Sequence, residues 1–180
     1  MKLLIIGSVA AGTSVGAKAR RNSEDLQITI YDRDQDISYS GCGIPYFVGG
    51  EIADIDELTP RDAAFFKKRY NIDIHTRHEV KSIDHATKTA TIVNLATGDR
   101  LTDTYDTLVL ATGASSIVPP FPGVDHDNVF TVRNVRNADA IRSYIDAHDP
   151  KTATIVGGGF IGLEMAEQLT SRGIQVTLVE

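Results

Sequence analysis

The chain has 180 residues, of which 42% are hydrophobic and 23% charged, as is usual for a globular protein. Its net charge of −6 argues against a nucleic-acid-binding protein, because phosphate backbones require a basic face. No apolar run approaches the roughly 20 residues that a membrane span needs, and we interpret the apolar start as a buried strand of a cytoplasmic protein rather than a signal peptide.

The N-terminal segment predicts a strand–turn–helix–strand unit. Residues 2–6 are a short apolar run, typical of a strand buried on both faces. A turn of small residues follows at 7–12, then a helix at 13–22 and a second strand at 26–31, which ends at Asp32. This order of elements is the core of a βαβ fold.

The middle of the chain is more varied. Residues 34–50 are irregular and rich in small side chains, and Thr59-Pro60-Arg61-Asp62 predicts the start of a helix that runs to about Tyr70. Strand-like segments between residues 73 and 101 predict an inserted antiparallel hairpin around Thr97-Gly98-Asp99. A further buried strand is expected at 105–111, a proline-rich linker at 116–123 and a helix at 137–148.

The opening pattern then returns, with a strand at 153–156, a glycine turn at 157–162, a helix at 163–171 and a strand at 175–179. The turn is a complete G-x-G-x-x-G motif. Gly157 makes the tight turn, Gly159 lets the backbone approach a pyrophosphate, and Gly162 lets the helix pack close to the strand. Glu180, which lies 23 residues after Gly157, is placed to bind a ribose diol, and this favours NAD.

The first turn departs from this motif because Val9 stands in the place of the middle glycine. Asp32 still follows Gly7 by 25 residues, at the end of the next strand. We therefore expect an α/β protein with two Rossmann-like dinucleotide-binding domains, the second of them truncated. The predicted divisions are a first domain at 1–115, a linker and helix at 116–150, and the start of a second domain at 151–180.

Cys42 is the only cysteine, so it forms no disulfide within the chain. It lies between Gly41 and Gly43, and Pro45 is suited to open a helix directly after it. A thiolate would be stabilised near such a positive helix end, which favours a reactive thiol over a small buried hydrophobe.

Six segments together resemble the single-cysteine branch of the pyridine nucleotide-disulfide oxidoreductases, a branch that includes coenzyme A-disulfide reductases, NADH oxidases and NADH peroxidases. They occur in family order, and they are Gly7-Ser8-Val9-Ala10-Ala11-Gly12, Ile30-Tyr31-Asp32, Cys42-Gly43-Ile44-Pro45-Tyr46, His78-Glu79-Val80, Leu110-Ala111-Thr112-Gly113-Ala114 and Gly157-Gly158-Gly159-Phe160-Ile161-Gly162-Leu163-Glu164.

The resemblance implies that the first turn binds FAD and the second binds NADH or NADPH, with Cys42 as the redox-active sulfur beside the flavin. The FAD contacts it implies are Gly7, Ser8, Val9, Ala10, Ala11, Gly12, Asp32, Arg33, Val80, Ala111, Thr112 and Gly113. The nicotinamide nucleotide contacts are Gly157, Gly159, Phe160, Ile161, Gly162, Glu164 and Glu180, with Phe160 as a gate over the flavin. The dithiol chemistry of relatives with a C-x-x-x-x-C pair is excluded, because Ile37 and Phe47 occupy the positions five residues from Cys42.

Ala10 stands where the oxidase and peroxidase members carry a histidine, which favours a coenzyme A disulfide or persulfide as substrate. The coenzyme A contacts implied by the resemblance are Ser14, Lys18, Arg21, Ser38 and Gly41. For Lys18 and Arg21, a solvated helix end is an equal alternative. Gly41 replaces an asparagine of the best-marked reductases, and Tyr70 falls near the place of a basic residue. An NADH oxidase that reduces O2, an NADH peroxidase and a non-catalytic nucleotide-binding fragment remain alternatives.

The five histidines show no metal-binding spacing, and we expect His75, His78 and His85 on the surface of the inserted hairpin. Because the second domain stops at its second strand, we expect the chain to be the N-terminal portion of a larger homodimeric enzyme. Alone, the 180-residue chain is expected to be inactive.

Overall fold

The computed structural model describes residues 1–180 and divides the chain into two compact units. The first unit comprises residues 1–39 and 59–114, and the second comprises residues 40–58 and 115–180. No helix in the structure is both long enough and apolar enough to cross a bilayer. The α/β architecture agrees with the fold class predicted from the sequence.

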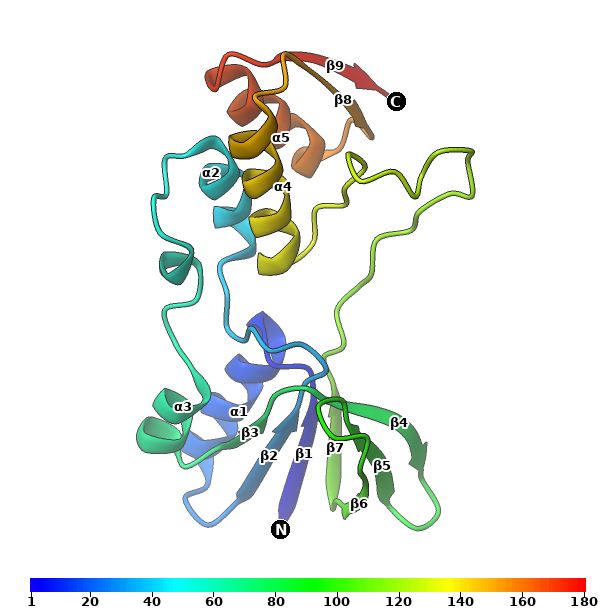
Figure 1. Cartoon of the computed structure of the whole chain (residues 1–180). Helices are drawn as coiled ribbons and strands as arrows, with labels where there is room; N and C mark the ends of the chain where they lie inside the picture. The colour runs from blue at the N-terminus through cyan, green and yellow to red at the C-terminus, as the bar shows by residue number, and fades with distance from the viewer. The chain divides into compact units, whose positions relative to one another are not determined.

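The first unit is built on a four-stranded parallel sheet in the order β3-β2-β1-β7. Its strands are β1 (Lys2–Ile6), β2 (Gln27–Tyr31), β3 (Asp73–His75) and β7 (Thr107–Leu110), and its helices are α1 (Ala10–Asn22) and α3 (Ala63–Tyr70). Figure 1 shows the strands of this sheet side by side, with α1 running between β1 and β2 in the chain.

The central strand β1 is buried on both faces, as its continuous apolar run predicts. Leu3 and Ile5 pack with Phe66 of α3 and Ile72 in one core. Leu4, which points to the opposite face, packs in a second core whose other members are Tyr31, Ala90, Ile92 and Tyr105. Alternation along a single strand therefore supplies two hydrophobic cores.

The second face of the sheet is covered by an antiparallel meander. It consists of β4 (His78–Asp84), β5 (Thr89–Asn94) and β6 (Arg100–Thr104), paired in that order. The predicted hairpin at 73–101 is thus corrected in two respects: it has three strands, and its first segment belongs elsewhere. Residues 73–75 form β3, which pairs in parallel with β2, because Ile74 packs into the helix-side core with Ile30.

The helices differ from the predicted ones at their N-terminal ends. The helix expected from Thr59-Pro60 begins at Ala63, because the Asp62 side chain accepts a hydrogen bond from the Phe65 backbone and caps it there. In the second unit, the helix expected from residue 137 begins at 135, where Asn134 and Asn137 form a reciprocal capping box. Both caps depend on side-chain geometry that hydrophobic periodicity does not reveal.

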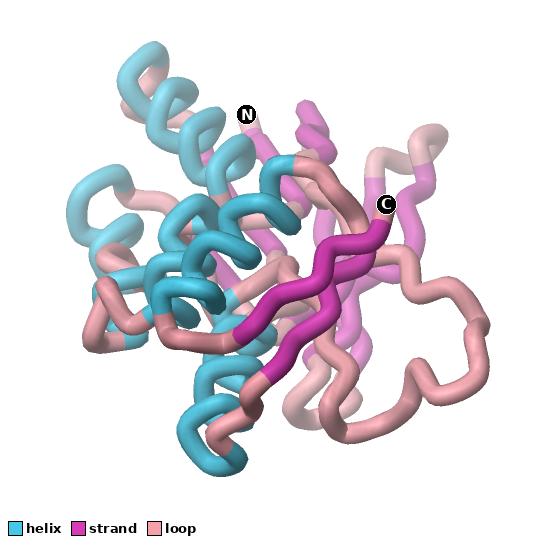
Figure 2. The backbone as a smooth tube through the Cα atoms, turned by 90° about the horizontal axis from the view of Figure 1, so that it is seen from above, coloured by secondary structure: helices cyan, strands magenta, loops and turns pink.

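The second unit contains α2 (Ile44–Gly49), α4 (Val135–His148), α5 (Phe160–Ser171) and a parallel pair of strands, β8 (Thr152–Val156) and β9 (Gln175–Val179). Two short 3₁₀ turns, η1 (Gly41–Gly43) and η2 (Ile55–Leu58), flank the segment around α2. Helix α2 packs against both α4 and α5, and Figure 2 shows β8 and β9 side by side near the C-terminus. Gly49 lies where α2 approaches α5, and a Cβ there would lie 1.8 Å from Oε1 of Gln168, so a larger residue would displace the Gln168 side chain.

Candidate functional site

The first glycine turn links β1 to α1 and has almost no room for larger side chains at its two ends. Gly7 has a φ of +102°, and a Cβ at this position would lie 2.1 Å from the carbonyl oxygen of Ala111. A Cβ on Gly12 would lie 1.8 Å from the carbonyl oxygen of Gly7. Both glycines are therefore required by the backbone of the turn.

The middle position of this turn has a different requirement. Val9 is the N-cap of α1 and has a φ of −87°, which a residue with a side chain adopts without left-handed strain. Gly159, its counterpart in the second turn, has a φ of −70°, and a Cβ added there would meet nothing within 4 Å. Neither middle position therefore requires glycine on account of a positive φ.

Asp32 at the end of β2 is held against the first turn. One of its carboxylate oxygens accepts hydrogen bonds from the backbone N–H of Ser8 at 2.7 Å and from the Ser8 hydroxyl at 2.6 Å. The other oxygen accepts from the backbone N–H of Asp34 at 2.9 Å. This pairing fixes the acid beside the turn that the family resemblance assigns to FAD.

The second turn repeats this arrangement. Gly157 has a φ of +111°, and a Cβ on Gly162 would lie 2.1 Å from the carbonyl oxygen of Gly157. Glu180, directly after β9, accepts a hydrogen bond from the backbone N–H of Gly158. The two turns thus place an acid at the same point relative to the start of the following helix, although they lie in separate compact units.

Both turns fit the pyrophosphate of a dinucleotide. No side chain caps the N-terminus of α1 or of α5, so neither helix uses a side chain of its own to satisfy its first N–H groups. Such groups, together with the helix dipole, favour an anion at this end. The open space at Gly159 leaves room for close approach by a ligand.

Cys42 is exposed, in the η1 turn that immediately precedes α2. A Cβ on Gly41 would meet nothing within 4 Å, whereas one on Gly43 would lie 2.8 Å from a methyl group of Leu58. The thiol therefore has open space on one side and a buried anchor on the other. Pro45 lies in the first turn of α2, as the sequence predicts.

Three of the predicted coenzyme A contacts in the first unit lie on one surface. Ser14, Lys18 and Arg21 are all exposed on α1, at the three- and four-residue spacing of one helix face. Ser38 has a φ of +50° and donates its backbone N–H to the carbonyl oxygen of Ser8. Gly41 belongs to the second unit, with Cys42.

A groove of about 640 Å³ adjoins the end of α1. It is lined by Arg20, Arg21, Glu24, Lys68, Arg69, Tyr70 and Asn71. The Arg20 side chain is engaged within the protein, because it donates hydrogen bonds to the carbonyl oxygens of Tyr70 at 2.7 Å and of Asn71 at 2.9 Å. The exposed side chains of Arg21, Lys68 and Arg69 give the groove its positive charge. Only the fold brings Lys68 and Arg69 to Arg21.

The remaining predicted contacts have diverse surroundings. Ala10, Ala11, Arg33, Thr112 and Gly113 are exposed, whereas Val80 packs against the meander-side core. Phe160 and Ile161, at the start of α5, are 89% and 59% exposed. Glu164 accepts a hydrogen bond from the Tyr46 hydroxyl at 3.2 Å, a contact that the sequence did not reveal. This bond raises the pKa of Tyr46 above its usual value.

Of the three histidines that the sequence predicts to be exposed, two are exposed in the structure. His75 and His85 are exposed, but His78 is half-buried, with its ring 6.1 Å from that of Tyr31 and 5.5 Å from that of His75. His78, the first residue of β4, is partly covered by the rings of Tyr31 and His75. No group of three or more potential ligands in the structure could hold a metal ion.

Two strand–turn–helix–strand units, each with a terminal acid, define the α/β dinucleotide-binding class of proteins. The sequence profile of the pyridine nucleotide-disulphide oxidoreductases matches residues 1–180, so the chain belongs to this family, as its motifs indicate. Members of this family depend on FAD and use NADH or NADPH.

Individual relatives are similar over essentially the whole chain. A coenzyme A disulfide reductase of Staphylococcus haemolyticus is 38% identical over 99% of this chain, and an NADH oxidase of Methanocaldococcus jannaschii is 38% identical over 100% of it. The crystal structure of reduced Bacillus anthracis CoADR-RHD superposes with a TM-score of 0.96, at 44% identity over 99% of this chain and 32% of that one. The chain spans 40% of the length of these two curated relatives.

Proposed function

We propose that this chain belongs to an FAD-dependent NAD(P)H oxidoreductase that reduces a coenzyme A disulfide or persulfide through Cys42. The observation that carries the proposal is the position of the only thiol, which is exposed in a glycine-flanked turn with open space beside Gly41. The two dinucleotide-binding turns supply the other requirement, a path for electrons from a nicotinamide nucleotide.

Binding of FAD is assigned to the first turn and to the residues that adjoin it. The amides at the start of α1 would hold the pyrophosphate, and Asp32 would exchange its bond from the Ser8 hydroxyl for one from the adenosine ribose. Residues 111–113 follow β7, directly beside Gly7, and are suited to a second contact. Residues 1–115 would form most of the FAD-binding domain.

Binding of NADH or NADPH is assigned to the turn at 157–162, within a second nucleotide domain that begins at residue 151. Its acid Glu180 would accept hydrogen bonds from the ribose diol. The exposed aromatic ring of Phe160 stands at the start of α5, as expected of a gate that closes over a flat ligand. Residues 116–150 would connect the two domains.

The proposed chemistry begins at the sulfur of Cys42. Its thiolate attacks one sulfur of the substrate disulfide, forms a mixed disulfide with one half and releases the other half as a thiolate. FAD held at the first turn would supply the two electrons needed, taken from NAD(P)H. Two-electron reduction of the mixed disulfide would return Cys42 to the thiolate and, after proton uptake, two substrate thiols would have formed for each NAD(P)H oxidised.

Two features support coenzyme A as the thiol carrier. Ala10, at the exposed start of α1, lacks the imidazole that would assist peroxide chemistry. The groove lined by Arg21, Lys68 and Arg69 offers positive charge to a phosphorylated substrate. Tyr70 stands near the place where the resemblance implies a basic residue, and the adjoining Lys68 and Arg69 would supply the charge that Tyr70 lacks.

The test is an anaerobic titration of the flavin-loaded whole protein with NADH, followed by addition of coenzyme A disulfide. We expect the protein with Cys42→Ser to accept electrons from NADH but to fail to form coenzyme A thiol. Thiol formation at an undiminished rate in Cys42→Ser would refute the mechanism. Mass analysis of the wild-type protein would identify any group attached to Cys42.

An NADH oxidase that reduces O2 is the second candidate, because an NADH oxidase is as similar to the chain as the reductase. Oxygen consumption without added disulfide, at a rate above disulfide turnover, would favour it.

A protein that binds nucleotide but shows no flavin absorbance would instead be a non-catalytic module. We further propose that the whole protein is a cytoplasmic homodimer. Light scattering of the whole protein measures its molar mass and so tests the oligomeric state.

A further inference from the structure

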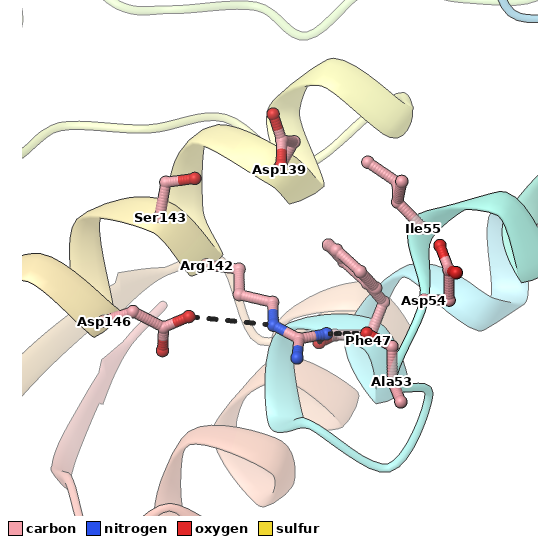
Figure 3. Close-up of a pocket in the computed structure, with 8 residues that line it drawn as sticks. All are labelled: Phe47, Ala53, Asp54, Ile55, Asp139, Arg142, Ser143 and Asp146. Carbon is pink, nitrogen blue, oxygen red and sulfur yellow. Dashed lines mark hydrogen bonds and ion pairs between the residues drawn. The ribbon is translucent and has the colours of Figure 1, made fainter.

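The C-terminal end of α2, the helix that follows Cys42, is held by a single arginine side chain. Nη1 of Arg142 lies 3.2 Å from the carbonyl oxygen of Phe47 and 3.2 Å from that of Ala53 (Figure 3). It also lies 2.9 Å from the carbonyl oxygen of Ile52. Arg142 comes from α4, about 90 residues further along the chain. One guanidinium thus connects the last turn of α2 with the loop that follows it.

Two further contacts orient this guanidinium. It lies over the ring of Phe47, with 4.5 Å from its central carbon to the ring centroid, and its Nε is 3.8 Å from a carboxylate oxygen of Asp146 (Figure 3). The Arg142 side chain is only 24% exposed. A planar group fixed by stacking, ion pairing and several acceptors loses little freedom for each bond it makes.

A second arginine acts on the same helix. Nη1 of Arg172, which caps the C-terminus of α5, donates to the carbonyl oxygen of Val48 at 3.0 Å, and its Nη2 pairs with Asp146. Asp146 therefore bridges both cations. The carbonyl groups at a helix C-terminus have no partners within the helix, and positive charge there is favourable.

Helix α2 requires such external support because it has only six residues. Helices this short are not stable on their own and take their position from tertiary contacts. Cys42 precedes α2 by a single turn, η1, which is anchored through a backbone hydrogen bond from Ser40 to the carbonyl oxygen of Leu58 at 2.8 Å and continues directly into the helix. A tilt of α2 at its C-terminal end would therefore displace the sulfur at the other end.

We propose that Arg142 is a positioning residue for the Cys42 thiol: by binding the carbonyl groups at the end of α2, it fixes the direction in which the helix presents the sulfur. This inference rests on the proposed role of Cys42 as the redox thiol. Arg142 touches neither substrate nor flavin in this scheme and acts only through α2.

The surroundings of Arg142 favour a folded variant. The side chain borders an open cavity of about 480 Å³, which is also lined by Asp54, Ile55, Asp139 and Ser143 (Figure 3). Water can enter this space and hydrate the carbonyl groups when the guanidinium is removed. Arg142→Met is therefore expected to release α2 without unfolding the unit.

The experiment compares Arg142→Met and Arg142→Lys with Arg136→Met, a matched control at an exposed arginine of the same helix. Each is prepared as the flavin-loaded whole protein. Rapid mixing measures two half-reactions separately, reduction of the flavin by NADH and its reoxidation by coenzyme A disulfide. Hydrogen exchange of the amides in residues 44–53 is measured in the same proteins, with or without flavin.

We expect Arg142→Met to leave flavin reduction unchanged and to slow reoxidation by roughly ten- to a hundred-fold, as displacements of about 1 Å do at reacting groups. Amide exchange in residues 44–53 should rise. Arg142→Lys, which retains one charge but not the fork, should restore part of the rate. Arg136→Met should behave as wild type in each measurement.

Unchanged reoxidation in folded Arg142→Met would overturn the proposal, as would an equal loss in both half-reactions, which indicates general damage. If Arg142→Met does not fold, the test rests on Arg142→Lys. A wild-type rate of reoxidation in Arg142→Lys would then also overturn the proposal. Cys42→Ser is run in parallel. Continued reoxidation by disulfide in Cys42→Ser refutes the proposed function itself, whatever Arg142 does.

Discussion

The hydroxyl of Tyr46 donates a hydrogen bond to a carboxylate oxygen of Glu164 at 3.2 Å. Tyr46 lies on α2, four residues after Cys42, and Glu164 lies on α5, two residues after the second glycine turn ends. The bond therefore joins the helix of the proposed redox thiol to the helix of the proposed nicotinamide site. It also means that Glu164, a predicted nucleotide contact, already has a partner within the protein.

This bond makes a prediction about the phenol. The hydrogen bond to Glu164, followed by the negative charge of that carboxylate, raises the pKa of Tyr46. In Glu164→Gln the charge is gone, so the pKa of Tyr46 should fall towards its usual value. Ultraviolet titration measures the change, and Tyr46→Phe identifies the contribution of Tyr46 among the six tyrosines. An identical titration in wild type and Glu164→Gln would contradict the pairing.

The stability of the first unit should depend on the protonation of His75. The His75 ring has an exposed edge, but it stacks on Tyr31 with ring centroids 5.1 Å apart and is thereby partly removed from water. This partial desolvation, followed by the nearby imidazole of His78, holds the pKa of His75 below its usual value, although Asp73 and Asp103 act in the opposite direction. The unfolded chain therefore takes up this proton first. Stability should be full above about pH 6.5 and fall as the pH drops from there towards the lower pKa of the folded state.

Urea unfolding at a series of pH values checks this expectation. His75→Asn should lose stability less steeply than wild type between about pH 7 and pH 5, because no proton is taken up on unfolding at this position. His126→Asn, at an exposed histidine, is the control for a general effect of removing an imidazole. Equal slopes for wild type and His75→Asn would contradict the assignment.

Gly7→Ala should damage both folding and cofactor binding. The new Cβ would lie 2.1 Å from the carbonyl oxygen of Ala111, and φ at this position is +102°. A clash with backbone combined with left-handed strain should lower the free energy of unfolding by about 3 kcal/mol or more. Urea unfolding and the flavin absorbance of the purified protein measure the two effects.

Gly41→Ala is the matched substitution for this test, because open space surrounds Gly41. Its free energy of unfolding should remain within about 0.5 kcal/mol of wild type. A comparable loss of stability in Gly7→Ala and Gly41→Ala would contradict the prediction that the clash and the positive φ at Gly7 cause the loss.

Arg21 should contribute to affinity for coenzyme A disulfide if the basic groove receives a phosphate. Loss of a charge-assisted hydrogen bond in Arg21→Gln should raise KM for that substrate by about ten-fold, without the same effect on a disulfide that lacks phosphate, such as cystine. Arg100→Gln, on exposed β6, should leave both KM values unchanged. An unchanged KM in Arg21→Gln would argue that Arg21 is only a solvated helix end.

Much of the candidate site could be predicted from local sequence. The two glycine turns, their flanking strands and the acids Asp32 and Glu180 all follow from short-range rules, because positive φ values at Gly7 and Gly157 and two-sided burial of a strand are encoded within a few neighbouring residues. The family resemblance rests on these same segments, and the family match confirms it.

The tertiary structure decided what depends on residues far apart in the chain. It assigned residues 73–75 to the parallel sheet, brought Lys68 and Arg69 to Arg21, and paired Tyr46 with Glu164 across 118 positions. It also placed Arg142 at the end of α2. None of these contacts has a local signal, because a hydrogen bond between distant segments is specified only when packing of the whole unit brings its donor and acceptor together.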